Sequence, residues 1–454
     1  MQTTLFLDRA LLPDGWARDV RISSSDGVIT AVETGAAPRS GEAREALGLP
    51  GVPNLHSHAF QRAMAGLAER RGPARDSFWT WREVMYRFLG RLDPDTVEAI
   101  AAYAFADMLE GGFTAVAEFH YLHHQPDGRP YADRAELALR HLAAADETGI
   151  GVTLLPVLYA HGDFGGAAPT EGQRRFLNDP DGLGEIITRA RTAIGDRADR
   201  RVGVAPHSLR AVTPDELAAV LPLAPDGPVH MHASEQTREV EDSLAWSGRR
   251  PVEWLIENAG VDARWCLIHA THLTPEETRA LAASGAVAGL CPITEANLGD
   301  GVFPAQDYLA VGGRFGVGTD SNIAVGAAEE LRALEYAQRL TTRGRNLLAP
   351  GEGASTGRAL LDGALAGGAQ ALGLPIGSLA VGLRADVVCL DMDHPDMGGR
   401  DGDLALDTFV FALGRSAIGS VYAGGRRVVE KGRHVGRAAI DARYRRALSD
   451  LMEA

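Results

Sequence analysis

Apolar runs of strand length recur through the middle of the chain and alternate with stretches of helical period. The eight runs cover 52–60, 113–123, 151–161, 201–211, 228–235, 265–273, 286–298 and 314–323. Most of them are followed by segments such as 96–112 and 213–221, in which apolar residues recur every three or four positions. Eight such units predict an α/β fold, a (β/α)8 TIM-like barrel, with a doubly wound open sheet as the alternative.

The two ends of the chain have a different pattern. Residues 4–34 alternate short apolar runs with Asp-Gly pairs, which are typical of hairpins, and the region after residue 376 is similar. We therefore expect a small β-sandwich domain built from both chain ends. The predicted parts are the split β-domain at 1–50 and 376–435, the barrel at 51–375 and a C-terminal helix at 436–454.

The composition is that of a globular protein of 454 residues with a net charge of −15. An acidic balance disfavours nucleic-acid binding, because nucleic-acid binders present a basic face. The cysteines Cys266, Cys291 and Cys389 lack CxxC spacing, which favours reduced thiols over disulfides. We see no signal peptide and no run of about 18 apolar residues, so we expect a cytoplasmic protein without a membrane partner.

Polar side chains collect at the carboxyl ends of the predicted barrel strands. In chain order these ends carry His56, His58, His120, Tyr121, His207, Arg210, His232, Glu235, His269 and Asp320. Barrel enzymes carry their chemistry at this end, while apolar side chains fill the barrel interior. These residues are therefore the candidates for a shared site.

Histidine pairs and one aspartate indicate a metal site. His56 and His58 share one face of a strand, and zinc and iron(II) readily accept imidazole nitrogens. Of the second pair, His230 and His232, we favour His232 because it lies nearer the strand end. Asp320 ends an apolar run, where an unpaired carboxylate is costly to bury, although a helix N-cap is its alternative role.

A mononuclear catalytic metal keeps an open position for a water molecule and lowers its pKa to about 7. Glu235 and His269 are the groups available to move its proton. Their division of labour stays open, because paired acid–base groups titrate jointly. The ligand set suits zinc, iron or manganese, and zinc is the ion that we expect.

The segments PNLHSHAF, HASE and GTDSN, with His269 at a strand end, resemble the amidohydrolase superfamily of metal-dependent barrel hydrolases. The resemblance covers nearly the whole chain. Members with two metals usually carry a carboxylated barrel lysine, whereas the only lysine here is Lys431, outside the barrel. The single-metal deaminase branch is therefore implied. In it the divalent metal ion is held by His56, His58, His232 and Asp320, and the catalytic residues are Glu235, His269 and Asp320.

Five further residues point to a small dicarboxylate substrate. They are Gln61, Arg82, Tyr121, His207 and Arg210. Arginine binds carboxylates bidentately, although a solvated surface position is the alternative for each arginine. The segments HSHAFQRAMAGLAER, EFHYLHH, APHSLRAV and CPITEANLGDG resemble one deiminase family of the superfamily. That resemblance implies hydrolysis of N-formimidoyl-L-glutamate to N-formyl-L-glutamate and ammonia, with an aromatic-rich lid around Arg82.

Two other functions stay open. A deaminase of a nucleobase or related ring would keep the metal site but would have no use for two arginines. A non-catalytic scaffold could keep the fold, but nothing would then preserve all the ligands and acid–base groups together. At the level of the superfamily we expect a homodimer.

Overall fold

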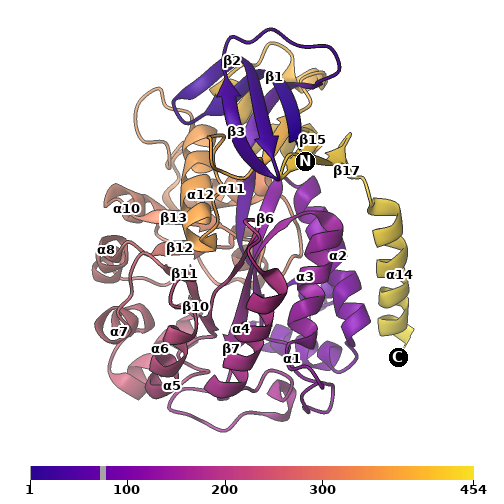
Figure 1. The fold of residues 1–454 in the computed structure, drawn as a ribbon. Coiled ribbons are helices and arrows are strands. Elements are labelled where there is room, and N and C mark those ends of the chain that lie inside the picture. Colours follow the sequence, from indigo (N-terminus) through magenta and orange to yellow (C-terminus); the bar gives the residue numbers. More distant parts are fainter. Residues whose placement is uncertain (1, 72–77, 454) are drawn as a thin grey trace.

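The computed structural model describes residues 2–71 and 78–453 and shows a barrel with a sheet at one end (Figure 1). The barrel strands are β5 (Val52–Ser57), β6 (Phe113–His120), β7 (Gly151–Leu158), β8 (Arg200–Val202), β9 (Ala205–Pro206), β10 (Val229–Ala233), β11 (Trp265–His269), β12 (Val287–Leu290) and β13 (Arg314–Val317). They pair in parallel in the order β10-β11-β12-β13-β5-β6-β7-β8, and β9 pairs with β7. A parallel bridge between Val204 and Val229 joins the two ends of this order. The predicted barrel is thus confirmed, and the open sheet is excluded.

Helices cover the outside of the barrel (Figure 1). They are α2 (Pro94–Glu110), α3 (Glu136–Thr148), α4 (Pro180–Ile194), α5 (Pro214–Val220), α6 (Thr237–Ser247), α7 (Pro251–Asn258), α8 (Pro275–Ser284), α9 (Pro292–Leu298), α10 (Ala305–Ala310), α11 (Ala327–Thr342) and α12 (Thr356–Leu372). Thr213 caps the start of α5, because its Oγ accepts from the backbone N–H of Glu216 at 3.3 Å. The apolar run 286–298 divides into β12 and α9, so its second half is helix rather than the predicted strand.

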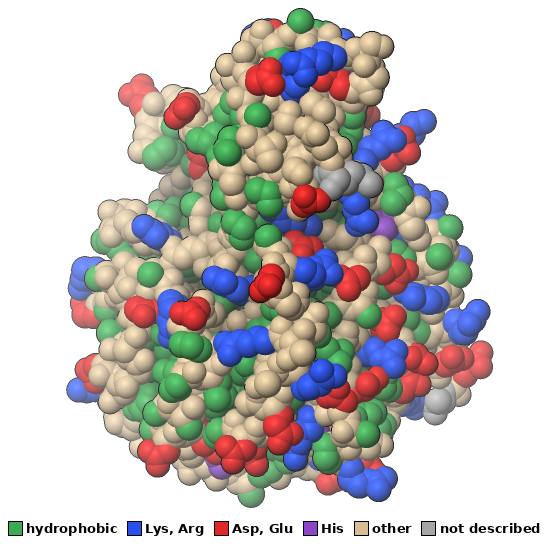
Figure 2. Space-filling model, viewed as in Figure 1, with side chains coloured by type: hydrophobic (Ala, Val, Ile, Leu, Met, Phe, Trp, Pro, Cys, Tyr) green, Lys and Arg blue, Asp and Glu red, His purple; other side chains and the backbone are tan. Residues whose placement is uncertain are grey.

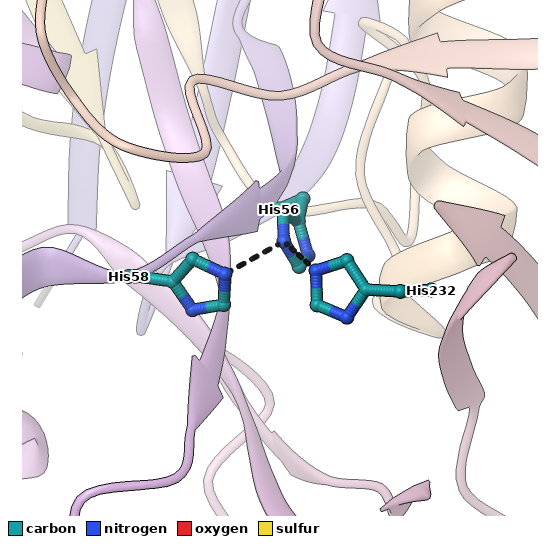
Figure 3. A group of neighbouring side chains, drawn as sticks. All are labelled: His56, His58 and His232. Carbon is teal, nitrogen blue, oxygen red and sulfur yellow. Dashed lines mark hydrogen bonds between the residues drawn. The ribbon is translucent and has the colours of Figure 1, made fainter. Parts of the chain in front are cut away.

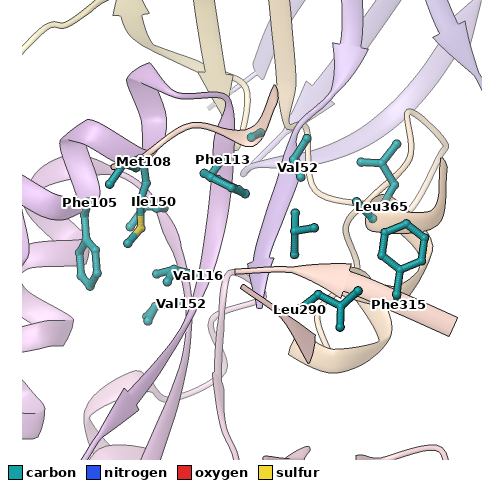
Figure 4. Packing of buried hydrophobic residues seen from close by; sticks show 14 of the residues in the cluster. Val52, Phe105, Met108, Phe113, Val116, Ile150, Val152, Leu290, Phe315 and Leu365 are labelled. Carbon is teal, nitrogen blue, oxygen red and sulfur yellow. The ribbon is translucent and has the colours of Figure 1, made fainter. Parts of the chain in front are cut away.

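Apolar side chains fill the space between the barrel strands and the helices (Figure 4). Phe105 and Met108 of α2 lie with Phe113 and Val116 of β6, and all four are fully buried. The carboxyl ends of the strands point away from this packing, so their polar residues are free to face a cavity.

Strands from both chain ends form one sheet, as predicted. It contains β1 (Gln2–Leu12), β2 (Gly15–Ser25), β3 (Val28–Glu33), β4 (Ala43–Pro50), β14 (Val387–Leu390), β15 (Ile418–Ala423), β16 (Arg426–Glu430) and β17 (Arg433–His434). The order is β17-β16-β15-β14-β4-β1-β2-β3, so β4 and β14 join the two ends of the chain. The connection from β14 to β15 includes a short helix, α13 (Asp403–Thr408), which the strand-like pattern of this region did not predict. Lys431 lies exposed in the turn between β16 and β17.

The last helix, α14 (Arg437–Glu453), packs against α2. The rings of Tyr444 and Tyr103 stack with centroids 3.8 Å apart, and the Arg437 guanidinium lies 4.2 Å from the same Tyr103 ring. Arg437 also pairs with Asp107 of α2 at 3.2 Å. The chain end is therefore fixed to the barrel by an aromatic stack and an ion pair.

Basic and acidic side chains are interspersed over the face shown in Figure 2. Among the described residues, no helix combines the length and the apolar character that a membrane crossing requires.

Candidate active site

Three imidazole rings meet at the carboxyl end of the barrel (Figure 3). His56 lies on β5, His58 follows that strand, and His232 lies near the end of β10. The Nε2 atom of His56 lies 3.1 Å from Nε2 of His58 and 3.2 Å from Nε2 of His232. Tetrahedral zinc with Zn–N bonds of about 2.0–2.1 Å places neighbouring nitrogens roughly 3.3–3.4 Å apart. Both distances are close to the spacing of ligands around one ion, and ligand atoms of all three residues lie within 4.8 Å of one another.

Backbone carbonyl groups fix the tautomers of two of these rings. Nδ1 of His58 donates to the carbonyl of Phe119 at 3.0 Å, and Nδ1 of His232 donates to that of His207 at 3.1 Å. A neutral ring that donates through Nδ1 presents a lone pair at Nε2. Burial lowers the pKa of His56 to about 3 and also lowers the pKa values of His58 and His232. The rings are therefore neutral and can bind a cation.

Asp320 joins this group from the loop after β13. Its Oδ1 lies 3.2 Å from Nε2 of His58 and 3.5 Å from Nε2 of His56. Burial opposes ionisation, but the hydrogen bond to His56 and the charge of His269 outweigh it and hold the pKa of Asp320 below its usual range. The structure therefore brings all four sequence-predicted ligands together, and their donor set fits a divalent metal.

Two buried amide side chains fasten the strand of the HxH pair to the strand that precedes the aspartate. Asn54 donates to Oγ1 of Thr319 at 2.7 Å and accepts from the Thr319 N–H at 3.1 Å. Asn322 accepts from the Thr319 hydroxyl at 2.6 Å and donates to Oγ of Ser57 at 3.1 Å and to the carbonyl of His58 at 3.2 Å. Side chains thus hold the ligand-bearing loops at a fixed separation.

Glu235 and His269 lie beside the ligands. Nε2 of His269 lies 3.7 Å from Oε1 of Glu235 and 3.7 Å from Oδ2 of Asp320, and its Nδ1 lies 3.2 Å from Oε1 of Glu295. Burial raises the pKa of Glu235 to about 7, although His269 and Arg210 oppose this. Burial disfavours the charged form of His269, yet Glu235, Glu295 and Asp320 raise its pKa to about 10. An acid that titrates near neutrality therefore lies next to a cationic ring.

Three barrel strands end in left-handed backbone at residues other than glycine. The φ angles are +54° at Ser234, +67° at His269 and +44° at Asp320. Such conformations cost of order 1–3 kcal/mol each and cluster at functional sites. Glu239 stabilises the first of these turns, because its two carboxylate oxygens accept the N–H groups of Ser234 at 3.3 Å and of Glu235 at 3.0 Å.

A cavity of about 60 Å³ lies over these residues. All five sequence-predicted substrate residues line it: Gln61, Arg82, Tyr121, His207 and Arg210. The helix α1 (Phe78–Leu89) contributes Met85 and Tyr86 as well as Arg82, so the predicted aromatic-rich insertion does cover the site.

Polar contacts organise the lining of this cavity. Nε2 of Gln61 donates to the hydroxyl of Tyr121 at 2.8 Å. Burial opposes the charge of Arg210, but nearby acidic groups, led by Glu239, outweigh it and raise its pKa. Burial, and then the Arg210 charge, lower the pKa of His207 well below its ordinary value. The cavity therefore holds a charged guanidinium, a neutral imidazole and an amide–phenol pair for a polar substrate.

Sequence reasoning missed several residues that support the site: Glu118, Glu239, Glu295 and the amide of Asn322. Glu295 lies in the segment CPITEANLGDG, which was considered only for its resemblance to a deiminase family. Glu239 lies in the first turn of α6, at the spacing of a capping residue, so its role could have been inferred from the sequence. Glu118 could not be found, because its partner Ala59 is distant in the chain.

A barrel that gathers histidines, an aspartate and an acid–base pair at its carboxyl end defines a metal-dependent hydrolase. The model of the amidohydrolase family matches residues 48–428, so the chain belongs to that family, whose members bind a metal. A model for the N-terminal domain of formimidoylglutamate deiminase matches residues 2–46. The formimidoylglutamate deiminase of Pseudomonas aeruginosa is 53% identical over 453 residues, 99% of this chain and 100% of the relative.

More distant relatives act on ring substrates by name. The 5-methylthioadenosine/S-adenosylhomocysteine deaminase of Natronomonas pharaonis is 29% identical and covers 91% of this chain and 88% of its own. A crystal structure of an amidohydrolase from Brucella melitensis superposes with a TM-score of 0.95 at 53% identity and covers 99% of this chain and 100% of its own. A zinc-bound adenosine deaminase from Xanthomonas campestris, at 23% identity, has a TM-score of 0.82 over 100% of this chain and 99% of its own, which reflects the shared fold.

Proposed function

We propose that this protein hydrolyses N-formimidoyl-L-glutamate to N-formyl-L-glutamate and ammonia, a step of histidine degradation. The observation that carries the proposal is the placement of Arg82 and Arg210 in one cavity with the metal-ligand group and the acid–base pair. A substrate with two carboxylates and one amidine needs all three features. The 53% identity to a formimidoylglutamate deiminase over nearly the whole chain supports it.

We also propose one divalent ion, zinc, on His56, His58, His232 and Asp320. The spacing of the three Nε2 atoms and the two backbone-fixed tautomers support this ligand set. When bound, the ion lowers the pKa of a water molecule and polarises the amidine. Iron and manganese suit the same donors, and metal analysis of the purified protein distinguishes the three.

The proposed reaction divides the proton transfers among the cavity residues. Asp320 and His269 orient the attacking water, Asp320 takes one of its protons, and the water oxygen forms a bond to the formimidoyl carbon. Glu235 protonates the =NH nitrogen as the tetrahedral intermediate forms, and the proton taken from the water restores Glu235. Glu235 then passes a second proton to the resulting NH2 group, which leaves as ammonia, while the hydroxyl proton of the intermediate is released to the acid–base pair as the C=O bond forms. A pKa near neutrality suits Glu235 for this role, since an acid transfers protons best when its pKa lies near the working pH.

We propose that Gln61, Arg82, Tyr121 and Arg210 hold the two carboxylates of the substrate, and that His207 lines the same space. Guanidinium groups bind carboxylates through two parallel hydrogen bonds, which fixes orientation as well as charge. The hydrogen bond between Gln61 and Tyr121 holds both polar groups in place before the substrate binds.

We extend the proposal to the organisation of the molecule. The split β-domain would comprise residues 1–50 and 376–435, the catalytic barrel 51–375 and the C-terminal helix 436–454. Three free, buried cysteines suit a reducing compartment, which supports a cytoplasmic location. A homodimer is proposed as the assembly, and sedimentation of the purified protein tests it.

The test is ammonia release by the metal-loaded protein from N-formimidoyl-L-glutamate, with guanine, cytosine and adenosine beside it and a chelated control. Turnover of the first substrate alone, abolished by the chelator, supports the proposal. Turnover of a ring substrate would retain the metal site and discard the arginine assignments. Absence of ammonia release from all four substrates would reject the proposed substrate class.

A further inference from the structure

A second group of potential ligands lies next to the first, around His269, Cys291 and Asp320. One ligand atom of each, a ring nitrogen, the Sγ and a carboxylate oxygen, lies within 4.8 Å of the other two, and all three residues are buried. Cys291 immediately precedes α9 and has no part in the proposed reaction. Imidazole, thiolate and carboxylate together bind zinc and similar soft divalent cations.

The Asp320 carboxylate faces both groups. Its Oδ1 lies toward Nε2 of His58 and of His56, at 3.2 Å and 3.5 Å, whereas its Oδ2 lies 3.7 Å from Nε2 of His269. In two-metal hydrolytic sites the ions are about 3.5–4 Å apart. Asp320 can therefore bind a second cation through Oδ2 and keep its contact with the first through Oδ1.

Glu295 orients the other two ligands. Its Oε1 lies 3.2 Å from Nδ1 of His269 and accepts the backbone N–H of Cys291 at 2.9 Å. A ring that donates Nδ1–H to a carboxylate presents Nε2 to a metal, as metal-bound histidines usually do.

We propose that Nε2 of His269, Sγ of Cys291 and Oδ2 of Asp320 form a second, inhibitory site for a soft divalent cation. His269 and Asp320 line the cavity, so the cation enters from there and reaches the thiol beneath. Tetrahedral zinc with Zn–S bonds of about 2.3 Å needs ligand atoms roughly 3.3–3.6 Å apart, so the side chains must move by about 1 Å. The thiol proton is released to solvent as the metal–sulfur bond forms.

The inhibitory effect rests on the proposed function of His269. A cation that replaces the proton on Nε2 blocks the contact through which His269 holds the attacking water, while the first ion keeps its four ligands. Excess zinc or cadmium should therefore stop turnover without displacing the resident ion. The barrel contains no lysine, so this site does not depend on a carboxylated lysine to bridge the ions.

The test titrates protein that holds one equivalent of zinc with Co²⁺ and, separately, with Cd²⁺. Cobalt bound to a thiolate gives a near-ultraviolet charge-transfer band that cobalt on nitrogen and oxygen ligands lacks. We expect the band in the wild type and in Cys389→Ala, a control in the end sheet, and not in Cys291→Ser or Cys291→Ala. Half-inhibition by Cd²⁺ should need at least tenfold more metal in both Cys291 variants, with turnover before Cd²⁺ addition unchanged.

A band that persists in Cys291→Ser, or equal Cd²⁺ sensitivity of wild type and variant, would overturn the proposal. So would a wild-type protein that binds no second equivalent. Failure of the proposed function is seen separately, as absent turnover of N-formimidoyl-L-glutamate by the one-zinc protein. The charge-transfer band can be observed whichever substrate the enzyme uses, and melting temperatures show whether each variant is folded.

Discussion

A buried carboxyl group, Glu118 of β6, lies beside the residues that follow β5 and is only 1% exposed. Its Oε1 accepts the backbone N–H of Ala59 at 2.7 Å and lies 3.4 Å from Nε2 of His141. His141 donates through Nδ1 to the carbonyl of Leu137 at 2.8 Å, so its Nε2 is an acceptor. Burial raises the pKa of Glu118 to about 8, and the hydrogen bonds from Ala59 and Ser57 limit the rise.

Glu118→Gln should flatten part of the dependence of stability on pH. Between about pH 4.5 and pH 8 the folded state keeps the Glu118 proton that the unfolded state loses. Stability therefore falls as pH rises through this window, by at most about 1.4 kcal/mol per pH unit. Glutamine cannot ionise, so the melting temperature of the variant should fall less between pH 5 and pH 8. Equal slopes for the two proteins would contradict the assigned protonation.

Arg82→Met and Arg210→Met should each lower kcat/KM for N-formimidoyl-L-glutamate by about 100-fold or more. A lost buried contact between charged groups costs roughly 2–5 kcal/mol, and every 1.4 kcal/mol is tenfold. Arg87, exposed on the same helix as Arg82, supplies the control variant Arg87→Met. Wild-type kcat/KM in both cavity variants would show that the arginines do not hold the carboxylates.

For single residues, the sequence predicted the side chains that lie at strand ends. It missed the residues whose role depends on contacts between distant parts of the chain. His56, His58, His232 and Asp320 each end an apolar run, which can be read from the chain. Glu118 lies within the apolar run of β6, and only the folded barrel places it beside Ala59.

The connection from β10 to α6 shows how an element end can position an acid. Ser234 adopts a φ of +54°, and Glu239, in the first turn of α6, accepts the N–H groups of Ser234 and Glu235. Glu239 is 1% exposed, so no solvent replaces it. The backbone on both sides of the acid is thus held by one carboxylate.

Glu239→Ala should lower kcat by at least tenfold with a smaller change in KM, because two buried N–H groups lose their acceptor and the turn relaxes. Glu239→Gln keeps one acceptor oxygen and should fall between wild type and Ala. Glu241→Gln, exposed on the same helix, is the matched control. A change confined to melting temperature, with kcat intact, would reduce Glu239 to a structural role.

Secondary-structure predictions were correct where a single hydrophobic pattern covered a whole strand or helix. They were wrong where one apolar run covered both a strand and a helix. The nine barrel strands follow the eight apolar runs, since β8 and β9 share the run 201–211, but each run continues past the observed strand into the loop. The run 286–298 joins a four-residue strand to a helix, and short apolar runs do not distinguish the two. The helix α13 interrupts a region whose composition is that of strands.

Across the whole molecule, α14 connects the end sheet to the flank of the barrel. Its aromatic contact, Tyr444 on Tyr103, lies on α2, away from the cavity at the carboxyl ends of the strands. Neither ring lines the cavity, so we expect this contact to stabilise the fold and to leave the chemistry unchanged.

Tyr444→Ala should lower the free energy of unfolding by about 2 kcal/mol, below the 3–5 kcal/mol of a fully buried aromatic residue, because Tyr444 is half-buried. The reduction is measured by denaturant unfolding, and kcat/KM should stay within twofold of the wild type. Arg445→Ala, at an exposed position of the same helix, should change neither quantity. A loss of activity at unchanged stability would reveal a path from α14 to the cavity.

Lys431, the only lysine of the chain, lies exposed in the turn between β16 and β17. This turn belongs to the end sheet, whereas α1, whose side chains line the cavity, lies at the opposite end of the barrel (Figure 1). An amine-reactive reagent therefore finds only one side-chain amine, that of Lys431, and this amine is remote from the cavity. Enzyme tethered to a support through that side chain would face one way, with every cavity turned toward the solution.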